Sequence, residues 1–169
     1  MPLITRPAVG PAATALARSP LAPAVLLPLI ADLPLTEYLR GSRLFPAVLG
    51  VEGQEGSWDR VGGGRRIRLA DGGSVVETLV ELAPGTSFAY ELTGFTDVFR
   101  LIVHGVRGEW SFAPDGDGCI VRWTWEFAPR RGRRLLMAAV VGPLWQRHAA
   151  RAVRLAVEAA QARRAEADA

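Results

Sequence analysis

The chain has 169 residues, of which 49% are hydrophobic and 22% are charged, as expected for one globular domain with a substantial core. Its formal net charge is only +3, and every basic residue is an arginine, so a Schiff-base lysine and a phosphate-loop lysine are both excluded. The single cysteine, Cys119, excludes an intrachain disulfide, and two histidines are too few for most histidine-based metal sites. We therefore expect no metal ion, no cofactor and no nucleic-acid partner.

The N-terminal region is rich in alanine and proline and carries no strong structural pattern. The apolar run Ala24–Ile30 is much shorter than the roughly 20 residues of a membrane span, and the sequence lacks the charged start and continuous apolar region of a signal peptide. We therefore expect residues 1–22 to be loosely ordered and residues 23–165 to form a single domain. The same features predict a cytoplasmic protein without an integral membrane segment.

Two prolines interrupt the next segment, Ala24–Tyr38. Pro28 and Pro34 both lack a backbone N–H, so one regular helix is not expected to run through the segment. The pattern predicts an edge strand or extended segment, followed by a turn or a short helix. A strand within Leu49–Trp58 is also expected, although three glycines weaken it.

A β-hairpin is the clearest feature of the central region. Arg65–Ala70 alternates between apolar and charged residues, and Ser74–Leu82 is rich in β-branched residues. Asp71-Gly72 between them is typical of a two-residue turn, because both positions favour a positive φ. This turn would pair Arg66 with Glu77 on the outer face of the sheet.

Three further strands are expected at Ser87–Thr93, Leu101–Ala113 and Cys119–Ala128. Their alternation predicts which side chains share the inner face of the sheet. The inner face is expected to carry Phe88, Tyr90, Leu92, His104, Val106, Trp110, Phe112, Cys119, Val121, Trp123, Trp125 and Phe127. Pro129 ends the last of these strands.

The end of the chain predicts a long amphipathic helix after a break at Gly142-Pro143. Its polar face is expected to carry Arg147, Arg151, Arg154, Glu158 and Gln161. Its opposite face is expected to carry Trp145, Ala149, Ala152, Ala156 and Ala159, flanked by Leu144, His148 and Leu155. Because alanine fills little volume, we expect a curved sheet packed on this face to leave a void.

An ordered series of segments carries a resemblance to a known superfamily. The segments are DLPL (Asp32–Leu35), GVEGQEGSWDRVGGGRRIRLADGG (Gly50–Gly73), VVETLVEL (Val75–Leu82), FAYELTGFT (Phe88–Thr96), GEWSFAPDGDG (Gly108–Gly118) and WTWEFAP (Trp123–Pro129). Over Ala24–Ala160 this series resembles the START-like (SRPBCC) superfamily, and in particular its bacterial polyketide cyclase/dehydrase and lipid transport branch. Cys119 departs from the threonine expected in its strand.

The resemblance implies an α+β helix-grip fold, in which a curved seven-stranded antiparallel sheet wraps around a long C-terminal helix. It also implies an internal cavity for a small hydrophobic or aromatic ligand, so residues 23–165 would be a START-like ligand-binding domain. It does not imply a reaction, because members of this superfamily bind ligands or catalyse cyclisation, dehydration or hydrolysis.

Five aromatic residues are the candidate ligand-binding side chains: Tyr90, Trp110, Trp123, Trp125 and Trp145. In a cavity they would contact a flat apolar ligand, with the Tyr90 O–H and the indole N–H groups as orienting donors. The alternative is that these side chains only pack the core.

Proton transfer has three candidate residues: Glu77, Tyr90 and His148, with Glu91 as a further carboxylate. A carboxylate that faces an apolar cavity has a raised pKa and can exchange protons near neutrality. With a two-residue turn, Glu77 lies on the outer face of the sheet beside an arginine. A bulge at Gly72-Gly73 would instead turn Glu77 inward. The resemblance keeps this inward position open. His148 borders the alanine face and is also a candidate ligand contact, while partial burial as a neutral side chain is the alternative.

Other reactive side chains have weaker patterns. His104 is a further candidate for proton transfer. Cys119 has no neighbouring base in the sequence, and the acidic pair Asp115 and Asp117 lies in a turn rather than in a metal-binding pattern.

A basic cluster, Arg130–Arg134, precedes the apolar run Leu135–Val141. We expect a solvated entry to the helix, with the apolar run serving as a lid or entrance of the cavity. Weak peripheral contact with an anionic membrane is the alternative.

Together these features predict a protein that binds a small hydrophobic or aromatic molecule, lipid-like or polyketide-like, between sheet and helix. The alternative is a cyclase/aromatase-type enzyme that uses the same pocket for aldol cyclisation and dehydration. The sequence leaves open whether the protein is a monomer or a homodimer.

Overall fold

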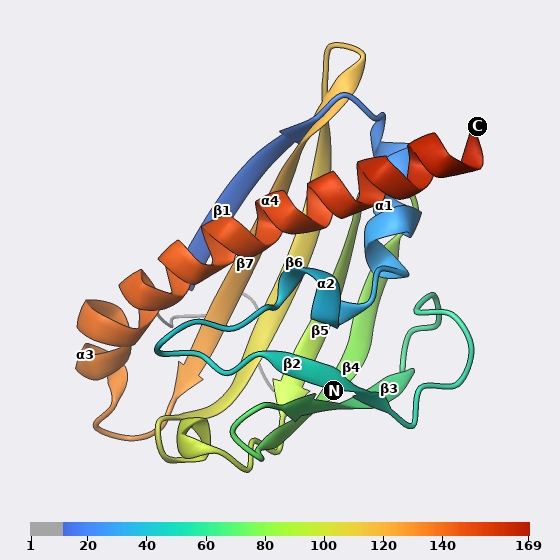
Figure 1. Ribbon diagram of the computed structural model, residues 1–169. Coiled ribbons are helices and arrows are strands. Elements are labelled where there is room, and N and C mark those ends of the chain that lie inside the picture. The colour runs from blue at the N-terminus through green and yellow to red at the C-terminus, as the bar shows by residue number, and fades with distance from the viewer. Residues whose placement is uncertain (1–11) are drawn as a thin grey trace.

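The computed structural model describes residues 12–169, which form one curved sheet and a set of helices (Figure 1). The strands are β1 (Ala12–Ser19), β2 (Val48–Glu52), β3 (Gly64–Leu69), β4 (Ser74–Ala83), β5 (Ser87–Thr93), β6 (Val103–Asp115) and β7 (Gly118–Pro129). The helices are α1 (Pro23–Ala31), α2 (Leu35–Tyr38), the 3₁₀ turn η1 (Val98–Leu101), α3 (Arg134–Leu136), the π-helical turn η2 (Met137–Val141) and α4 (Gly142–Ala167).

The sheet has seven antiparallel strands in the order β1-β7-β6-β5-β4-β3-β2. It curves around α4, which crosses its concave face, while α1 and α2 connect β1 to β2 on the same side (Figure 1). The predicted α+β architecture, a curved seven-stranded sheet around a long C-terminal helix, is therefore confirmed.

Strand β1 corrects the prediction of a loosely ordered segment over residues 1–22. Residues 12–19 pair in register with β7, and Ala13 and Ala15 are buried while Thr14 and Leu16 face solvent. The local composition gives little strand signal, so the strand depends on the hydrogen bonds offered by β7. The rest of that prediction for residues 1–11 lies outside the described residues.

Helix α1 corrects the prediction of an extended segment after Pro23. Pro23 occupies the first turn, where its missing N–H removes no helical hydrogen bond, but Pro28 lies inside the helix. Only one hydrogen bond is lost in so short a helix, and burial of Leu26, Leu27 and Ile30 offsets that loss. As predicted, no single helix runs through Ala24–Tyr38, because α1 ends at Ala31 and the short helix α2 begins after Pro34.

The β3–β4 hairpin has the predicted strands but a different register. Leu69 and Gly72 close a turn, Gly72 adopts a φ of +85°, and Leu69 N–H also donates to the carbonyl of Gly73. This is a three-residue loop with a glycine bulge rather than a two-residue turn. Consequently Arg65, and not Arg66, pairs with Glu77, and both of these side chains face the concave side.

Strand β6 contains an irregularity that removes His104 from the inner face. The register with β7 shifts between Val103 and Gly105, so His104 is the extra residue of a bulge and its side chain is exposed. The prediction that His104 shares a face with Trp110 is therefore wrong. The alternation along β7 is confirmed, because Cys119, Val121, Trp123, Trp125 and Phe127 are all buried.

The C-terminal helix is longer than predicted, because Gly142-Pro143 does not break it. The helix runs without interruption from α3 through η2 into α4. Pro143 has no N–H to donate, and the preceding turn widens so that Gly142 N–H donates to Met137 five residues earlier. The predicted polar face is confirmed from Arg147 to Glu158.

Candidate functional site

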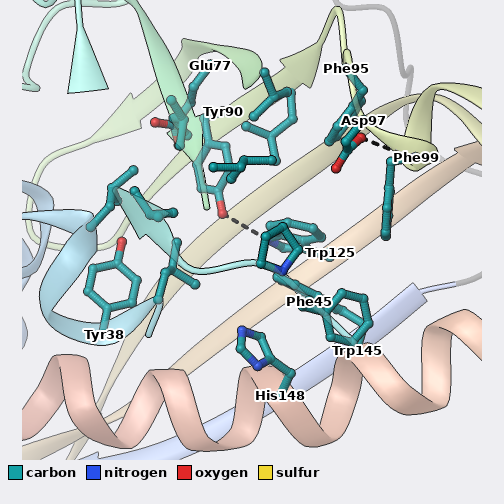
Figure 2. Close-up of a pocket in the computed structure, with 18 of the residues that line it drawn as sticks. Tyr38, Phe45, Glu77, Tyr90, Phe95, Asp97, Phe99, Trp125, Trp145 and His148 are labelled. Carbon is teal, nitrogen blue, oxygen red and sulfur yellow. Dashed lines mark hydrogen bonds between the residues drawn. The ribbon is translucent and has the colours of Figure 1, made fainter. Parts of the chain in front are cut away.

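A cavity lies between the concave face of β2–β5 and the first turns of α4 (Figure 2). The cavity has a volume of about 80 Å³ and opens to solvent on one side. The walls are mainly aliphatic and aromatic. Glu77, Tyr90 and Tyr38 are buried, whereas Pro46, Phe99 and other members are half-buried and mark the side that meets solvent.

Four of the five predicted aromatic residues line this cavity: Tyr90, Trp123, Trp125 and Trp145. Trp125 of β7 stacks on Trp145 of α4 with ring centroids 3.8 Å apart, so sheet and helix share one aromatic surface. Trp110 does not line the cavity, because it stacks behind Trp123 at 4.8 Å and is fully buried.

Tyr90 is the polar centre of this aromatic wall. Its hydroxyl oxygen accepts hydrogen bonds from the indole N–H groups of Trp123 and Trp125, each at 2.9 Å. Burial, reinforced by the nearby Glu77 carboxyl, raises the pKa of the Tyr90 hydroxyl well above its usual range. Tyr90 is therefore a neutral phenol at physiological pH.

Glu77 faces the cavity, as the shifted hairpin register requires. Its Oε2 accepts a hydrogen bond from Arg65 Nε at 2.5 Å, and Arg65 also donates to Gln54 at 2.9 Å. The Arg65 guanidinium lies 4.0 Å above the centre of the Trp58 ring. Burial raises the pKa of Glu77, although the charge and the hydrogen bond of Arg65 oppose this shift.

His148 borders the cavity on α4, as predicted, and lies among aromatic rings. Its ring centroid is 5.1 Å from that of Trp145 and 5.4 Å from that of Phe45. Partial burial lowers the pKa of His148, and the positive charge of Arg151 on the next turn acts in the same direction. The side chain is half-buried and favours the neutral form.

Two titratable residues of the cavity were missed by the sequence analysis. Tyr38 of α2 contacts the Trp123 ring edge-on, and burial raises the pKa of its hydroxyl well above the usual range. Asp97 caps η1 by accepting a hydrogen bond from Phe99 N–H at 3.0 Å, and burial raises its pKa as well. Neither residue lies on a predicted strand or on the long helix, so no periodicity pointed to it.

The remaining candidates lie elsewhere. Glu91 is paired across the sheet with Arg107 on the face opposite to Tyr90 and does not line the cavity. Cys119 is buried, which raises its thiol pKa, so a reactive thiolate is disfavoured. Asp115, the last residue of β6, lies 3.4 Å from Arg18.

The apolar run Leu135–Val141 does not form a lid in this structure. None of its residues lines the cavity, and Leu135 is 82% exposed, while Met137 is buried. The arginines of the cluster Arg130–Arg134 are also exposed. Contact of this end of the molecule with an anionic membrane stays a prediction, which the binding of anionic vesicles at low and high salt would test.

Among residues 12–169, no group of three or more histidine, cysteine or acidic side chains is arranged to hold a metal ion. Within the same residues, no helix combines the length and the hydropathy that crossing a bilayer would need.

Several solved structures share this fold. The Zhui aromatase/cyclase from Streptomyces sp. R1128 aligns with a TM-score of 0.62 at 17% identity, covering 90% of this chain and 94% of that one. TTHA0849 from Thermus thermophilus aligns with a TM-score of 0.63 at 22% identity, covering 90% and 98%. Ara h 8.0201 aligns with a TM-score of 0.60 at 18% identity, covering 88% and 96%. At these identities the similarity establishes the helix-grip fold alone.

Comparison with curated protein sequences found no significant match. A family model described as polyketide cyclase / dehydrase and lipid transport matches residues 13–159, which include every strand except the first residue of β1, and most of α4. This match spans the walls of the cavity and its polar groups, and the chain therefore belongs to the polyketide cyclase/dehydrase and lipid transport family.

Proposed function

We propose that the protein binds a small, flat, hydrophobic molecule in the cavity between the sheet and α4, and that it carries or sequesters this molecule in the cytoplasm. The observation that carries the proposal is a mostly apolar cavity with a small number of polar groups on its buried side. Sites of this composition bind small molecules by burial of apolar surface and orient them with the few polar groups.

The dimensions of the cavity favour an aromatic ligand over a long flexible chain. The stacked rings of Trp125 and Trp145 offer flat surface, and the cavity volume is only about 80 Å³. A ligand of one or two fused rings would fit with modest side-chain movement, whereas an extended acyl chain would require the walls to separate.

Tryptophan fluorescence tests the proposal directly, since three tryptophans line the cavity. Titration with 2-acetylnaphthalene is expected to quench the emission in a saturable way. Val48→Phe fills the cavity and should abolish saturable quenching, whereas Val51→Phe on the exposed side of the same strand should leave it unchanged. Unsaturable quenching that is equal in all three proteins would refute binding in this cavity.

A cyclase-type enzyme is the second candidate, and the inward position of Glu77 favours it. Glu77 and Tyr90 line one cavity, so a carboxylate of raised pKa and a phenol face the same space. In such an enzyme Glu77 would accept a proton from the carbon next to a ketone, while Tyr90 would donate a hydrogen bond to the ketone oxygen. The product of this step is the enolate from which aldol closure begins.

Exchange of the methyl protons of 2-acetylnaphthalene in D₂O, followed by NMR, separates the two candidates. An enzyme should accelerate the exchange, and Glu77→Gln should remove the acceleration. Exchange at the rate of the buffer, together with saturable binding of the ketone, would leave the carrier function standing and reject the enzyme.

A further inference from the structure

The Tyr90 ring occupies space that a glycine on the neighbouring strand leaves open. Tyr90 of β5 pairs directly with Gly108 of β6, and Gly108 pairs in turn with Trp125 of β7. A Cβ atom placed on Gly108 would overlap the ring and the hydroxyl of Tyr90. The ring therefore lies across the backbone of β6, where only glycine leaves room, and its hydroxyl reaches the tryptophans of β7.

Both acceptor positions of the Tyr90 hydroxyl are occupied by the protein. A phenol oxygen accepts two hydrogen bonds and donates one, and an indole N–H only donates. Trp123 and Trp125 each place Nε1 at 2.9 Å from this oxygen, so together they use both of its lone pairs. The only hydrogen-bonding capacity that remains to Tyr90 is its own proton.

No acceptor for that proton is found among residues 12–169. The Tyr90 side chain is 4% exposed and lines the cavity, and the carboxyl of Glu77 is engaged by Arg65 without a hydrogen bond to Tyr90. Figure 2 shows the hydroxyl end of Tyr90 directed into the space above α4. A buried donor without an acceptor is costly, so a molecule in the cavity that supplies an acceptor is favoured over one that does not.

We infer that Tyr90 acts as a dedicated hydrogen-bond donor that selects flat apolar ligands carrying a ketone-type acceptor oxygen. The inference rests on the proposed binding function and adds to it the chemical class of the ligand. It assigns distinct parts to the surrounding residues. Trp123 and Trp125 occupy the acceptor positions of Tyr90, and Gly108 leaves the space that the Tyr90 ring occupies.

A pair of ligands with the same shape tests this selection. 2-Acetylnaphthalene carries a carbonyl oxygen where 2-isopropenylnaphthalene carries a methylene group, so the pair differs mainly in the acceptor. The wild-type protein is expected to bind the ketone at least about tenfold more tightly than the alkene, measured by quenching of tryptophan emission. Because Tyr90→Phe alone would free the indole N–H groups of Trp123 and Trp125 as donors, it is combined with Trp123→Phe and Trp125→Phe. This triple variant should bring the ratio of the two dissociation constants close to the ratio set by their hydrophobicity in water, with Trp145 as the remaining emitter in the cavity.

The infrared stretch of the ketone carbonyl gives a second measurement that needs no variant. With a ¹³C-labelled carbonyl, the band of the ketone bound to the wild-type protein is expected at lower frequency than in an alkane solvent. Equal affinities of wild type for ketone and alkene, with an unshifted band, would overturn the inference and leave the binding function intact. Failure of both ligands to bind would instead refute the binding function itself.

Discussion

Two parts of α4 meet the sheet in different ways. From Ala149 to Ala160 the inward side chains are almost entirely buried, and the helix packs directly on β1 and α1. One turn earlier, Trp145 and His148 face the cavity in front of β2–β5. The sequence predicts the void beside the alanines of α4, but none of these alanines lines the cavity, so this prediction is wrong.

The reason lies in how closely two backbones can approach. Helix α4 contacts β1, and small residues are buried on both elements: Ala152 and Ala156 on the helix and Ala13 and Ala15 on the strand. Small side chains let the two backbones approach closely. A void forms instead where large rings hold the helix away from the sheet. Trp145 stacked on Trp125 is such a spacer, and the cavity begins beside it.

The part of the molecule around the cavity also contains the buried ion pair Arg65–Glu77. Breaking this pair gives the largest expected effect on stability. Glu77→Leu would leave the Arg65 guanidinium buried without its carboxylate and should lower the free energy of unfolding by about 3–5 kcal/mol in urea titrations. Replacing both residues, as Arg65→Met with Glu77→Leu, should recover most of that loss. A double variant as unstable as the single one would show that the pair itself stabilises the cavity wall.

Matched insertions of one methylene compare the directly packed segment of α4 with the wall of the cavity. Val153→Leu adds one methylene at an inward position of α4 that is fully buried and should lower the free energy of unfolding by about 1–3 kcal/mol. Val75→Leu adds one methylene at the cavity wall and should cost less than about 1 kcal/mol. If Val75→Leu proved the more damaging of the two in urea titrations, the assignment of the solid and hollow parts would be wrong.

Much of the fold could be predicted because periodic patterns report burial. The inward residues of β7 and the polar face of α4 were both identified, since each follows the repeat of its own element over many residues. Strand β1 was missed because its alanines carry little intrinsic preference for a strand. It forms through pairing with β7, whose paired residues lie 100 to 114 positions later in the chain.

The register of the β3–β4 hairpin could not be decided from the sequence. Arg65 and Arg66 are adjacent, and either one can oppose Glu77 with a favourable charge. Val75 and Val76 are likewise interchangeable opposite Ile67. A shift of one residue changes which face each side chain occupies, and here it moves Glu77 from solvent into the cavity. The chemistry of the candidate site thus depends on a turn type that local composition left open.

The smallest expected effect concerns His148, at the border between the two parts. Because its pKa in the folded state is lowered, the unfolded chain binds a proton more readily at and below pH 6.5, the ordinary pKa of histidine. The contribution of His148 to stability is therefore present above that pH and is lost as the pH falls through 6.5 toward the lowered value. On the outer side of His148, the charged side chains are those of Arg43, Arg147 and Arg151, and all three carry positive charge.

Urea unfolding of wild type and His148→Gln at pH 7.5 and pH 5.5 measures this contribution. The free energy of unfolding of wild type minus that of the variant should be smaller at pH 5.5 than at pH 7.5. His104→Gln is the matched control, since His104 is exposed at the bulge of β6 and does not line the cavity. A difference that stays constant for His148→Gln would mean that partial burial beside Trp145 does not favour the neutral imidazole. The turn at Trp145 and His148 would then be better solvated than the cavity geometry implies.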